Sequence, residues 1–516
     1  MDFEEKKRRQ RIRIVIAEVG MVLSVIAIVV VATLAAMGFM ISGNGGIEQY
    51  GLMQLHSLPT GAAVTIDENT LFARTNLSRT LASGQHQLEI SRDGYDTWSK
   101  TITIYPGVLI RIYYPRLFLQ NRVVEEVLTL MEKNNLEFYT PSASRNYIIY
   151  AERGSSEWRM LDIRGDEVKT TILDLSGVLP GMVEEKVTSG TVTAKDNAAI
   201  AVTHNYKFEG KIEEVRWSGN EESVLVKVKY EEKSSWVLVR LRDMAKSVNL
   251  TETFGLSSDV RLEFIDDAAS QLFALEQRQL RRINASDGVM SRILVGNVVD
   301  FSSRGNSTVY VTENPTTKIR EIGVFRDDDK SGTTITEVPN AAKAQVALSS
   351  YYGDDYIVYA IDSEVTILYG RLPSYHENAS GLGELKRLTD GTLALSKTPT
   401  RLSVSPEGEY VVGQTGDSLM VIDLDMGDLY EYTTPSAKLR WFDSSMLYDI
   451  KDGQILVWDF DGTNQRNLAK SATTAGGQEV AVNDAPIVVT ANNRYLYYLS
   501  FDTDKGLVLA REKIRE

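Results

Sequence analysis

Histidine and cysteine, which often bind metals or act as nucleophiles and bases, are scarce in this chain. Cysteine is absent from all 516 residues, which excludes disulfides, thiolate zinc sites, iron–sulfur clusters and cysteine nucleophiles. Four histidines are present, and none stands in an H-x-x-x-H spacing: His56, His86, His204 and His376. We therefore expect no zinc site. His86 follows a predicted turn and has no acid nearby in the sequence, so we interpret it as a structural or surface histidine.

Two clusters of carboxylates have the side chains, but not the spacing, of a cation site. The stretch Arg326-Asp-Asp-Asp-Lys-Ser-Gly332 lacks the alternating ligands and distal glutamate of a calcium loop, and it suits a solvated hairpin tip. Asp459, Asp461 and Asn464 form a D-x-D-G-x-N pattern that suits a turn between strands. No G-x-S-x-G sequence occurs. We predict no catalytic, cofactor-binding or metal-binding residue and no cofactor, although acidic pairs from separate strands could still cleave a glycan.

One long apolar segment lies near the N-terminus. Residues Val19–Ile41 carry no charge over 23 positions, and six lysines and arginines precede them within residues 1–13. A helix of this length covers the roughly 30 Å hydrocarbon core of a bilayer. Because basic flanks stay in the cytoplasm, we predict a cytoplasmic tail over 1–18, a single-pass signal-anchor helix over 19–41 and an extracytoplasmic C-terminal part. A cleaved signal peptide and a buried soluble helix are the alternatives.

The predicted extracytoplasmic part is strongly acidic. The whole chain carries a net charge of −14, and its first thirteen residues are net positive, so the remainder is more acidic still. Such a surface repels nucleic acid and anionic lipid, and it excludes both as main partners. An exported chain without disulfides is held by packing alone, which favours a bacterial cell envelope over a eukaryotic secretory route.

Residues 53–116 alternate apolar and polar positions, with turn residues between the alternating runs. Val64 and Ile66 are one such pair, and Ile102 and Ile104 are another. This period of two predicts half-buried antiparallel strands of a small β-sandwich, after a linker over 42–52.

Several short motifs within this region resemble a PEGA domain. They are Pro59-Thr-Gly-Ala62, Val64-Thr-Ile-Asp67, Leu81-Ala-Ser-Gly84-Gln-His86, Gly94-Tyr95 and Trp98. The chain departs from the family pattern at Thr60, at Glu68 and over Ala73–Asn76. The resemblance implies a small sandwich without catalytic activity, which acts as a spacer or binding module beside a membrane anchor. We expect Tyr95 and Trp98 to lie in its core.

The next segment, residues 117–135, is predicted to be a helical connector. Its apolar residues recur at helical spacing, which indicates a one-sided helix between two domains; they are Val123, Val124, Val127, Leu128 and Met131. An outer strand of the following domain is the alternative.

From residue 136 to 516 a weak unit of short strands and polar turns recurs. Eight candidate copies of roughly 40–50 residues are typical of a β-propeller, in which four-stranded sheets stack around a ring. The turn Ser405-Pro-Glu-Gly408 and the stretch Trp458–Thr463 resemble TolB-type propeller repeats. We favour eight blades over seven, and a pair of β-sandwiches is the rival fold. A long loop predicted over 177–197 joins the first two units, and another over 371–386 interrupts a later unit.

The fold class is therefore mainly β: a transmembrane helix, a PEGA-like sandwich and a propeller. These parts suggest a binding or scaffolding protein, anchored in the membrane, that presents its propeller outside the cytoplasm to an envelope protein or a glycan. An enzyme acting on glycan in the propeller funnel and a structural protein of envelope assembly are the alternatives. Fold alone does not separate the three, because propellers host all of them.

Overall fold

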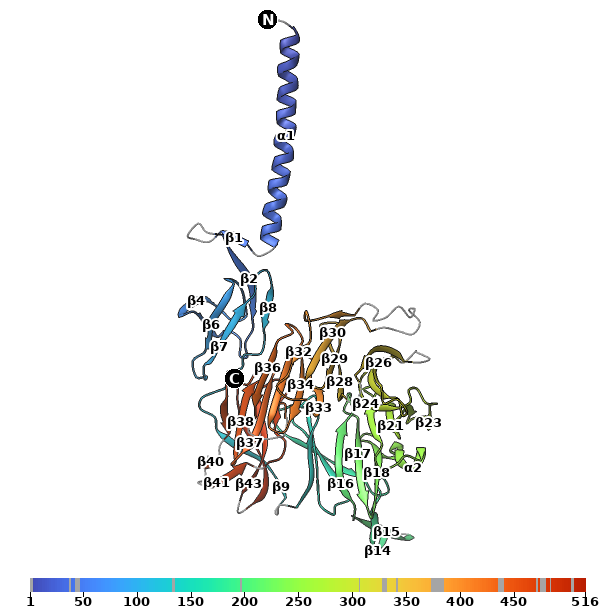
Figure 1. Ribbon diagram of the computed structural model, residues 1–516. Helices are drawn as coiled ribbons and strands as arrows, with labels where there is room; N and C mark the ends of the chain where they lie inside the picture. The colour runs from blue at the N-terminus through green and yellow to red at the C-terminus, as the bar shows by residue number, and fades with distance from the viewer. Residues whose placement is uncertain are drawn as a thin grey trace. The chain divides into compact units, whose positions relative to one another are not determined.

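A computed structural model describes most of the chain (Figure 1). The described residues are 3–36, 39–41, 47–131, 135–194, 197–305, 307–326, 332–339, 342–372, 385–434, 440–469, 472–473, 479–482, 484–502 and 505–516. They form two compact units, one made of Met1–Asn121 with Arg515–Glu516 and the other of Arg122–Ile514.

The first unit begins with helix α1 (Phe3–Ala36). Within it, Val15–Leu34 is long and apolar enough to cross a membrane, and none of this stretch is buried by the rest of the chain. The helix therefore covers most of the predicted segment but ends before Ile41. Residues Phe39–Ile41 form strand β1, which pairs with strand β2 (Ile47–Leu55).

The predicted linker over 42–52 is thus wrong in its second half, because β2 already begins at Ile47. The remaining strands of this unit are β3 (Ala63–Ile66), β4 (Asn69–Arg74), β5 (Leu77–Ala82), β6 (Gly84–Ser91), β7 (Trp98–Ile104) and β8 (Leu109–Ile112). They form two small sheets, β4-β3-β6-β7 and β1-β2-β5 with β8 beside β2. Tyr95 and Trp98 are buried, as expected.

The second unit is a succession of antiparallel sheets in chain order. The first four comprise β10 (Leu136–Pro141), β11 (Tyr147–Glu152), β12 (Glu157–Asp162), β13 (Lys169–Asp174); β16 (Lys211–Trp217), β17 (Ser223–Tyr230), β18 (Lys233–Arg240), β19 (Val248–Asn249); β20 (Arg261–Phe264), β21 (Gln271–Glu276), β22 (Gln279–Asn284), β23 (Val289–Met290); and β24 (Val298–Arg304), β25 (Ser307–Glu313), β26 (Arg320–Arg326), β27 (Thr333–Val338). Short helices η1 (Met244–Lys246) and α2 (Leu250–Phe254) flank β19.

Four further sheets follow. They comprise β28 (Ala344–Tyr351), β29 (Asp354–Ile361), β30 (Glu364–Gly370), β31 (Lys386–Arg387), β32 (Leu393–Ala394); β33 (Arg401–Val404), β34 (Tyr410–Thr415), β35 (Ser418–Asp423), β36 (Leu429–Thr433); β37 (Met446–Lys451), β38 (Gln454–Asp459), β39 (Arg466–Ala469); and β40 (Ala472–Thr473), β41 (Glu479–Val482), β42 (Val488–Val489), β43 (Tyr495–Asp502), β44 (Gly506–Lys513) with β9 (Val124–Met131).

Strand β9 corrects the predicted helical connector and bears out its alternative. It pairs with β44, so a strand from the beginning of this unit completes the sheet at its end. Such pairing closes a ring of sheets and removes its open edge. The register shifts twice along β9, and each bulge adds a residue that the partner strand does not oppose. These extra residues turn an alternating pattern into one that resembles helical spacing.

The predicted insert loop over 177–197 is also different from expectation. Its greater part is strand β14 (Met182–Ala194), which pairs with β15 (Asn197–Phe208) as a separate two-stranded ribbon. Most of the other predicted loop, over 371–386, lies outside the described residues.

The second unit is a β-propeller. The first strands of successive sheets are neighbours, as for β24 with β28 and β28 with β33, and apolar cores lie between successive sheets. The described residues contain eight such sheets apart from the β14–β15 ribbon, and they support the favoured eight blades, which stay a prediction.

The turn that begins with Ser405 shows how the repeat motif folds. The Gly408 amide donates to the Ser405 carbonyl at 3.0 Å, and Gly408 has a φ of 86°. A Cβ at this position would stand 2.5 Å from the Ser350 carbonyl oxygen of the preceding sheet. Only glycine fits there, so the motif sets both a turn and the approach of two sheets.

Candidate functional site

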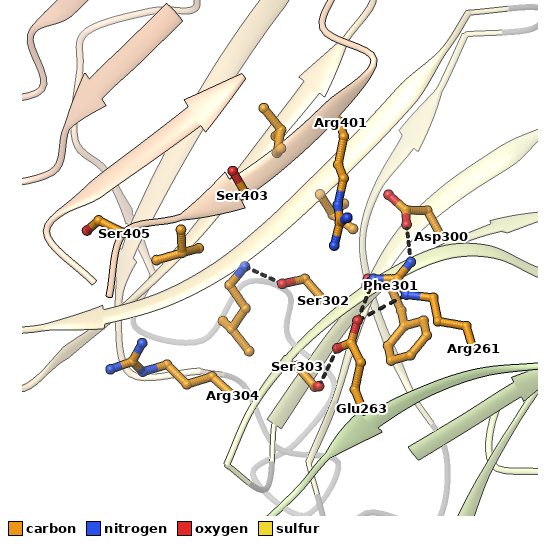
Figure 2. A pocket seen from close by; sticks show the side chains of 14 residues that line it. Arg261, Glu263, Asp300, Phe301, Ser302, Ser303, Arg304, Arg401, Ser403 and Ser405 are labelled. Carbon is orange, nitrogen blue, oxygen red and sulfur yellow. Dashed lines mark hydrogen bonds and ion pairs between the residues drawn. The ribbon is translucent and has the colours of Figure 1, made fainter. Parts of the chain in front are cut away.

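A polar cavity of about 350 Å³ lies on the innermost strands of four successive sheets (Figure 2). Strands β20, β24, β28 and β33 each present a few residues to it, and each is the first strand of its sheet. Strand β28 lies beside both β24 and β33, and Arg261 of β20 contacts Asp300 of β24. The lining residues are Arg261, Glu263, Asp300, Phe301, Ser302, Ser303, Arg304, Val346, Leu348, Arg401, Leu402, Ser403, Val404 and Ser405.

Arg261 ties one side of the cavity together. Its guanidinium contacts Glu263 Oε1 at 2.5 Å and Asp300 Oδ1 at 2.9 Å, and it donates to the Phe301 carbonyl at 2.7 Å. It also lies 4.4 Å from the centroid of the Phe301 ring. The second oxygen of Glu263 accepts a hydrogen bond from Ser303 at 2.7 Å. This arginine therefore joins β20 to β24, and its charge is balanced within the protein.

Burial and ion pairing act in opposite directions on the pKa values of this cluster. Burial opposes the charge of Arg261, yet Glu263 and Asp300 outweigh it and raise the pKa of the guanidinium. Burial raises the pKa of Asp300 above its ordinary value, although Arg261 acts in the opposite direction. The contacts of Arg261 with Glu263 and Asp300 place both carboxylates in one ion-pair network.

Arg401, on the opposite side of the cavity, is different. Its side chain is exposed and has no hydrogen bond, ion pair or ring contact with the described residues. In the view of Figure 2 its guanidinium is directed toward the side of the cavity where Arg261 and Asp300 lie. Arg304 also has no hydrogen-bond partner among the described residues, but its charge acts on Asp355 and helps to lower the pKa of that carboxyl against the effect of burial.

Two other arginines of the propeller, one on a first strand and one shortly before β37, contact acids of the protein. Arg216 on β16 contacts Glu214 at 2.6 Å and donates to the Leu262 carbonyl of the next sheet at 2.5 Å. Arg440, just before β37, contacts Asp484 at 3.1 Å. Both stack near an aromatic ring. Among the described residues Arg401 makes none of these structural contacts, which leaves its charge available to a ligand.

Hydroxyl groups complete the polar lining. Ser302 accepts a hydrogen bond from the Leu348 amide at 3.1 Å, and Ser405 accepts one from the Tyr410 amide at 3.0 Å. Each hydroxyl keeps a proton to donate. The cavity thus offers a guanidinium and hydroxyl donors, while its acids are occupied, and it suits a ligand that supplies hydrogen-bond acceptors.

The histidines considered above are not brought to this cavity. His56 stacks on Tyr113 with ring centroids 4.2 Å apart, and His86 contacts Asp67 at 2.5 Å, both within the first unit. The sheet thus supplies His86 with an acid that the local sequence does not. The side chain of His204 and all of His376 lie outside what the structure describes. Among the described residues, no group of three or more acids and histidines is arranged to hold a metal ion.

The structure describes one of the two carboxylate clusters that were considered as cation sites. Asn464 donates to Asp459 at 3.0 Å and Asp461 accepts from the Thr463 amide at 3.1 Å, so this stretch forms the expected turn after β38. Most of the cluster over 326–332 lies outside the described residues.

Sequence reasoning missed every residue of the cavity. A weak signal existed: Arg261, Glu263 and Asp300 are charged, partly buried residues that stand next to buried apolar residues of their strands. A charge on an innermost strand faces the ring interior, but finding it requires knowing which strand of each repeat is innermost.

Comparison with known families bears directly on the first unit. Residues 51–115 match the PEGA domain. The PEGA domain accounts for most of the two small sheets of the first unit, and its limits agree with the predicted 53–116. A comparison with curated proteins finds no match.

Solved structures that align with the chain include propellers. The C-terminal WD40 domain of Sif2 is 12% identical, covering 75% of this chain and 98% of that chain, with a TM-score of 0.41. The Dos1 propeller is 10% identical, with 75% and 94% covered and a TM-score of 0.38. An oligogalacturonate lyase from Vibrio parahaemolyticus is 11% identical, with 65% and 99% covered and a TM-score of 0.37. The propeller assignment rests on the sheet order and closure described above, and not on these distant matches.

Proposed function

We propose that this chain is a membrane-anchored binding protein of a bacterial envelope, in which α1 is the anchor, the PEGA domain is a stalk and the propeller carries the ligand site. The N-terminus would lie in the cytoplasm and both folded domains outside it. The basic residues before the apolar helix support this orientation. An envelope protein or a glycan is the expected partner.

The observation that carries the binding role is the polar cavity with its unengaged Arg401. Ligand pockets are concave, partly apolar and lined by a few polar groups that fix orientation. Here Arg401 and the serines are the polar groups, and the buried side chains of Phe301, Val346 and Leu348 lie beneath them.

Binding is favoured over catalysis by the state of the carboxylates. A glycosidase needs two acids free to act as general acid and as base or nucleophile. Glu263 and Asp300 line the cavity, but Arg261 contacts both, and Ser303 contacts Glu263 as well. We therefore propose that the protein is not an enzyme.

Filling the cavity tests this role. In Ser403→Trp a bulky ring would occupy the cavity, whereas Lys386→Trp places the same ring on the exposed β31. Full-length protein in detergent, immobilised and incubated with envelope material of its own organism, should retain protein or glycan in the wild type and in Lys386→Trp. Ser403→Trp should retain several-fold less.

Equal retention by all three proteins, or none by the wild type, would contradict a binding role for the cavity. Appearance of new reducing ends in the incubated material, lost in Glu263→Gln, would favour the glycan enzyme instead.

A further inference from the structure

Arginines on the innermost strands or close to them in the sequence are found in two distinct states. Arg216, Arg261 and Arg440 each contact an acid and an aromatic ring, and they join neighbouring sheets or strands. Arg401 begins β33 and has none of these contacts among the described residues. Because guanidinium is rigid and presents paired N–H groups, it matches the geometry of a carboxylate or phosphate.

The charges around the cavity select between those two anions. Three arginines and two carboxylates line it, which leaves one net positive charge when all five are ionised. A monoanion cancels this charge. A phosphate monoester carries nearly two negative charges at neutral pH and would face Glu263 and Asp300 at close range, where like charges repel.

The volume and the lining of the cavity narrow the chemical class of the ligand further. About 350 Å³ is at the lower end of ligand sites, which suits a molecule of monosaccharide size. Phe301, Val346 and Leu348 lie beneath the lining and are almost fully buried, so the surface that a ligand would meet is mainly polar. Ser302 and Ser403 line the cavity and are suited to hydrogen-bond with hydroxyl groups of the ligand (Figure 2).

We propose that the cavity binds a small molecule with a single carboxylate, which accepts paired hydrogen bonds from Arg401 while its hydroxyl groups contact the serines of β24 and β33. This inference rests on the proposed binding function and names the chemical class of the ligand. Arg261 has a positioning role: it holds Glu263 and Asp300, so that their charges are offset and do not repel the carboxylate.

Calorimetric titration of the full-length protein in detergent tests the proposal with matched probes. D-Glucuronate and D-gluconate carry one carboxylate, D-glucose lacks the charge, and glucose 6-phosphate carries a phosphate on the same framework. At least one of the two acids should bind more tightly than glucose and more tightly than glucose 6-phosphate. Raising the salt concentration should weaken the binding of the acid, since charge carries it.

Arg401→Gln should weaken binding of the acid by about ten- to a hundredfold, the range expected for loss of hydrogen bonds to a charged group. Arg401→Lys keeps the charge but not the paired donors and should recover only part of the affinity. Arg387→Gln removes the same charge from the exposed β31 and should bind as the wild type does. Equal melting temperatures would show that each variant is folded, as expected for an exposed arginine without a partner among the described residues.

The proposal is overturned if neither acid binds more tightly than glucose, if glucose 6-phosphate binds most tightly, or if Arg401→Gln leaves the affinity of the acid unchanged. Retention of envelope material that Ser403→Trp abolishes would still support a binding protein in each of these cases. The ligand class and the binding function can therefore fail separately.

Discussion

At the scale of single residues, His86 has an unusual setting within the PEGA domain. Its Nδ1 lies 2.5 Å from Asp67 Oδ2, and its Nε2 lies 2.8 Å from the Ala82 carbonyl oxygen. Both ring nitrogens face acceptors, so the imidazolium, which has two N–H donors, fits best. Partial burial opposes the charge, but the hydrogen bonds to Asp67 and Ala82 outweigh it and raise the pKa of His86.

This geometry predicts a pH dependence with a definite sign. Since the folded pKa is raised, the stabilisation is complete below the unfolded value near 6.5 and is lost as pH rises through the folded value. Hydrogen–deuterium exchange at the imidazole carbon, read by mass spectrometry on the full chain, should give His86 a pKa above 6.5, and Asp67→Asn should lower it. A pKa at or below 6.5 in the wild type would contradict this account.

The pKa of Asp423, at the end of β35, is also raised, but here because burial disfavours the charged form. Burial, reinforced by the nearby charge of Glu409, raises its pKa to about 7. A carboxyl with a raised pKa holds its proton more tightly when folded, so ionisation costs stability as pH rises from about 4 to about 7.

Asp423→Asn should therefore stabilise the propeller at pH 8.5, by roughly 1–3 kcal/mol, and change little at pH 4.5. The asparagine oxygen can still accept from the Asp425 amide, which contacts Asp423 Oδ1 at 2.8 Å. Thermal denaturation of both proteins at the two pH values measures the difference. A variant that is less stable than the wild type at pH 8.5 would show that the ionised carboxylate is stabilising.

At the scale of elements, β9 decides how the propeller closes. Arg511 on β44 contacts Glu125 at 2.7 Å, and Lys505 contacts Glu126 at 2.6 Å. Leu130 and Met131 are buried in a core shared with the first sheet. Strand β9 thus contributes these two ion pairs and buried apolar side chains to the last sheet.

Truncating a buried side chain of β9 should destabilise the propeller. Leu130→Ala should lower the free energy of unfolding of the propeller by about 2–5 kcal/mol, as for other buried leucines. Val123→Ala is the matched control, because Val123 is 75% exposed and precedes β9, and it should have little effect. Urea denaturation followed by tryptophan fluorescence measures both; a loss no greater than the control's would contradict closure by β9.

The sequence predicted the elements better than it predicted the site. Alternation such as that of Val64 and Ile66 is set by the pleat of each strand, so sheets and repeats could be recognised locally. The helix expected over 117–135 failed because two bulges shift the register of β9. The cavity could not be found, since Arg261, Asp300 and Arg401 come from three different sheets and meet only after the ring forms.

At the scale of the whole molecule, the chain combines a helix that can span a membrane, a PEGA domain and a propeller with a polar cavity. Its lack of cysteine allows a direct test of orientation, because an introduced cysteine is the single thiol of this sequence and the protein can be isolated after labelling. Asp417 is exposed in the turn between β34 and β35, so Asp417→Cys reports on the propeller. Glu4→Cys reports on the basic tail.

The most direct test of the central claim is labelling of these two variants by a membrane-impermeant maleimide in intact cells. The anchored arrangement predicts that Asp417→Cys is labelled at once and that Glu4→Cys is labelled only after the membrane is permeabilised, with both variants migrating at full length. Labelling of Glu4→Cys alone in intact cells, or protection of Asp417→Cys until permeabilisation, would contradict a propeller held outside the cytoplasm.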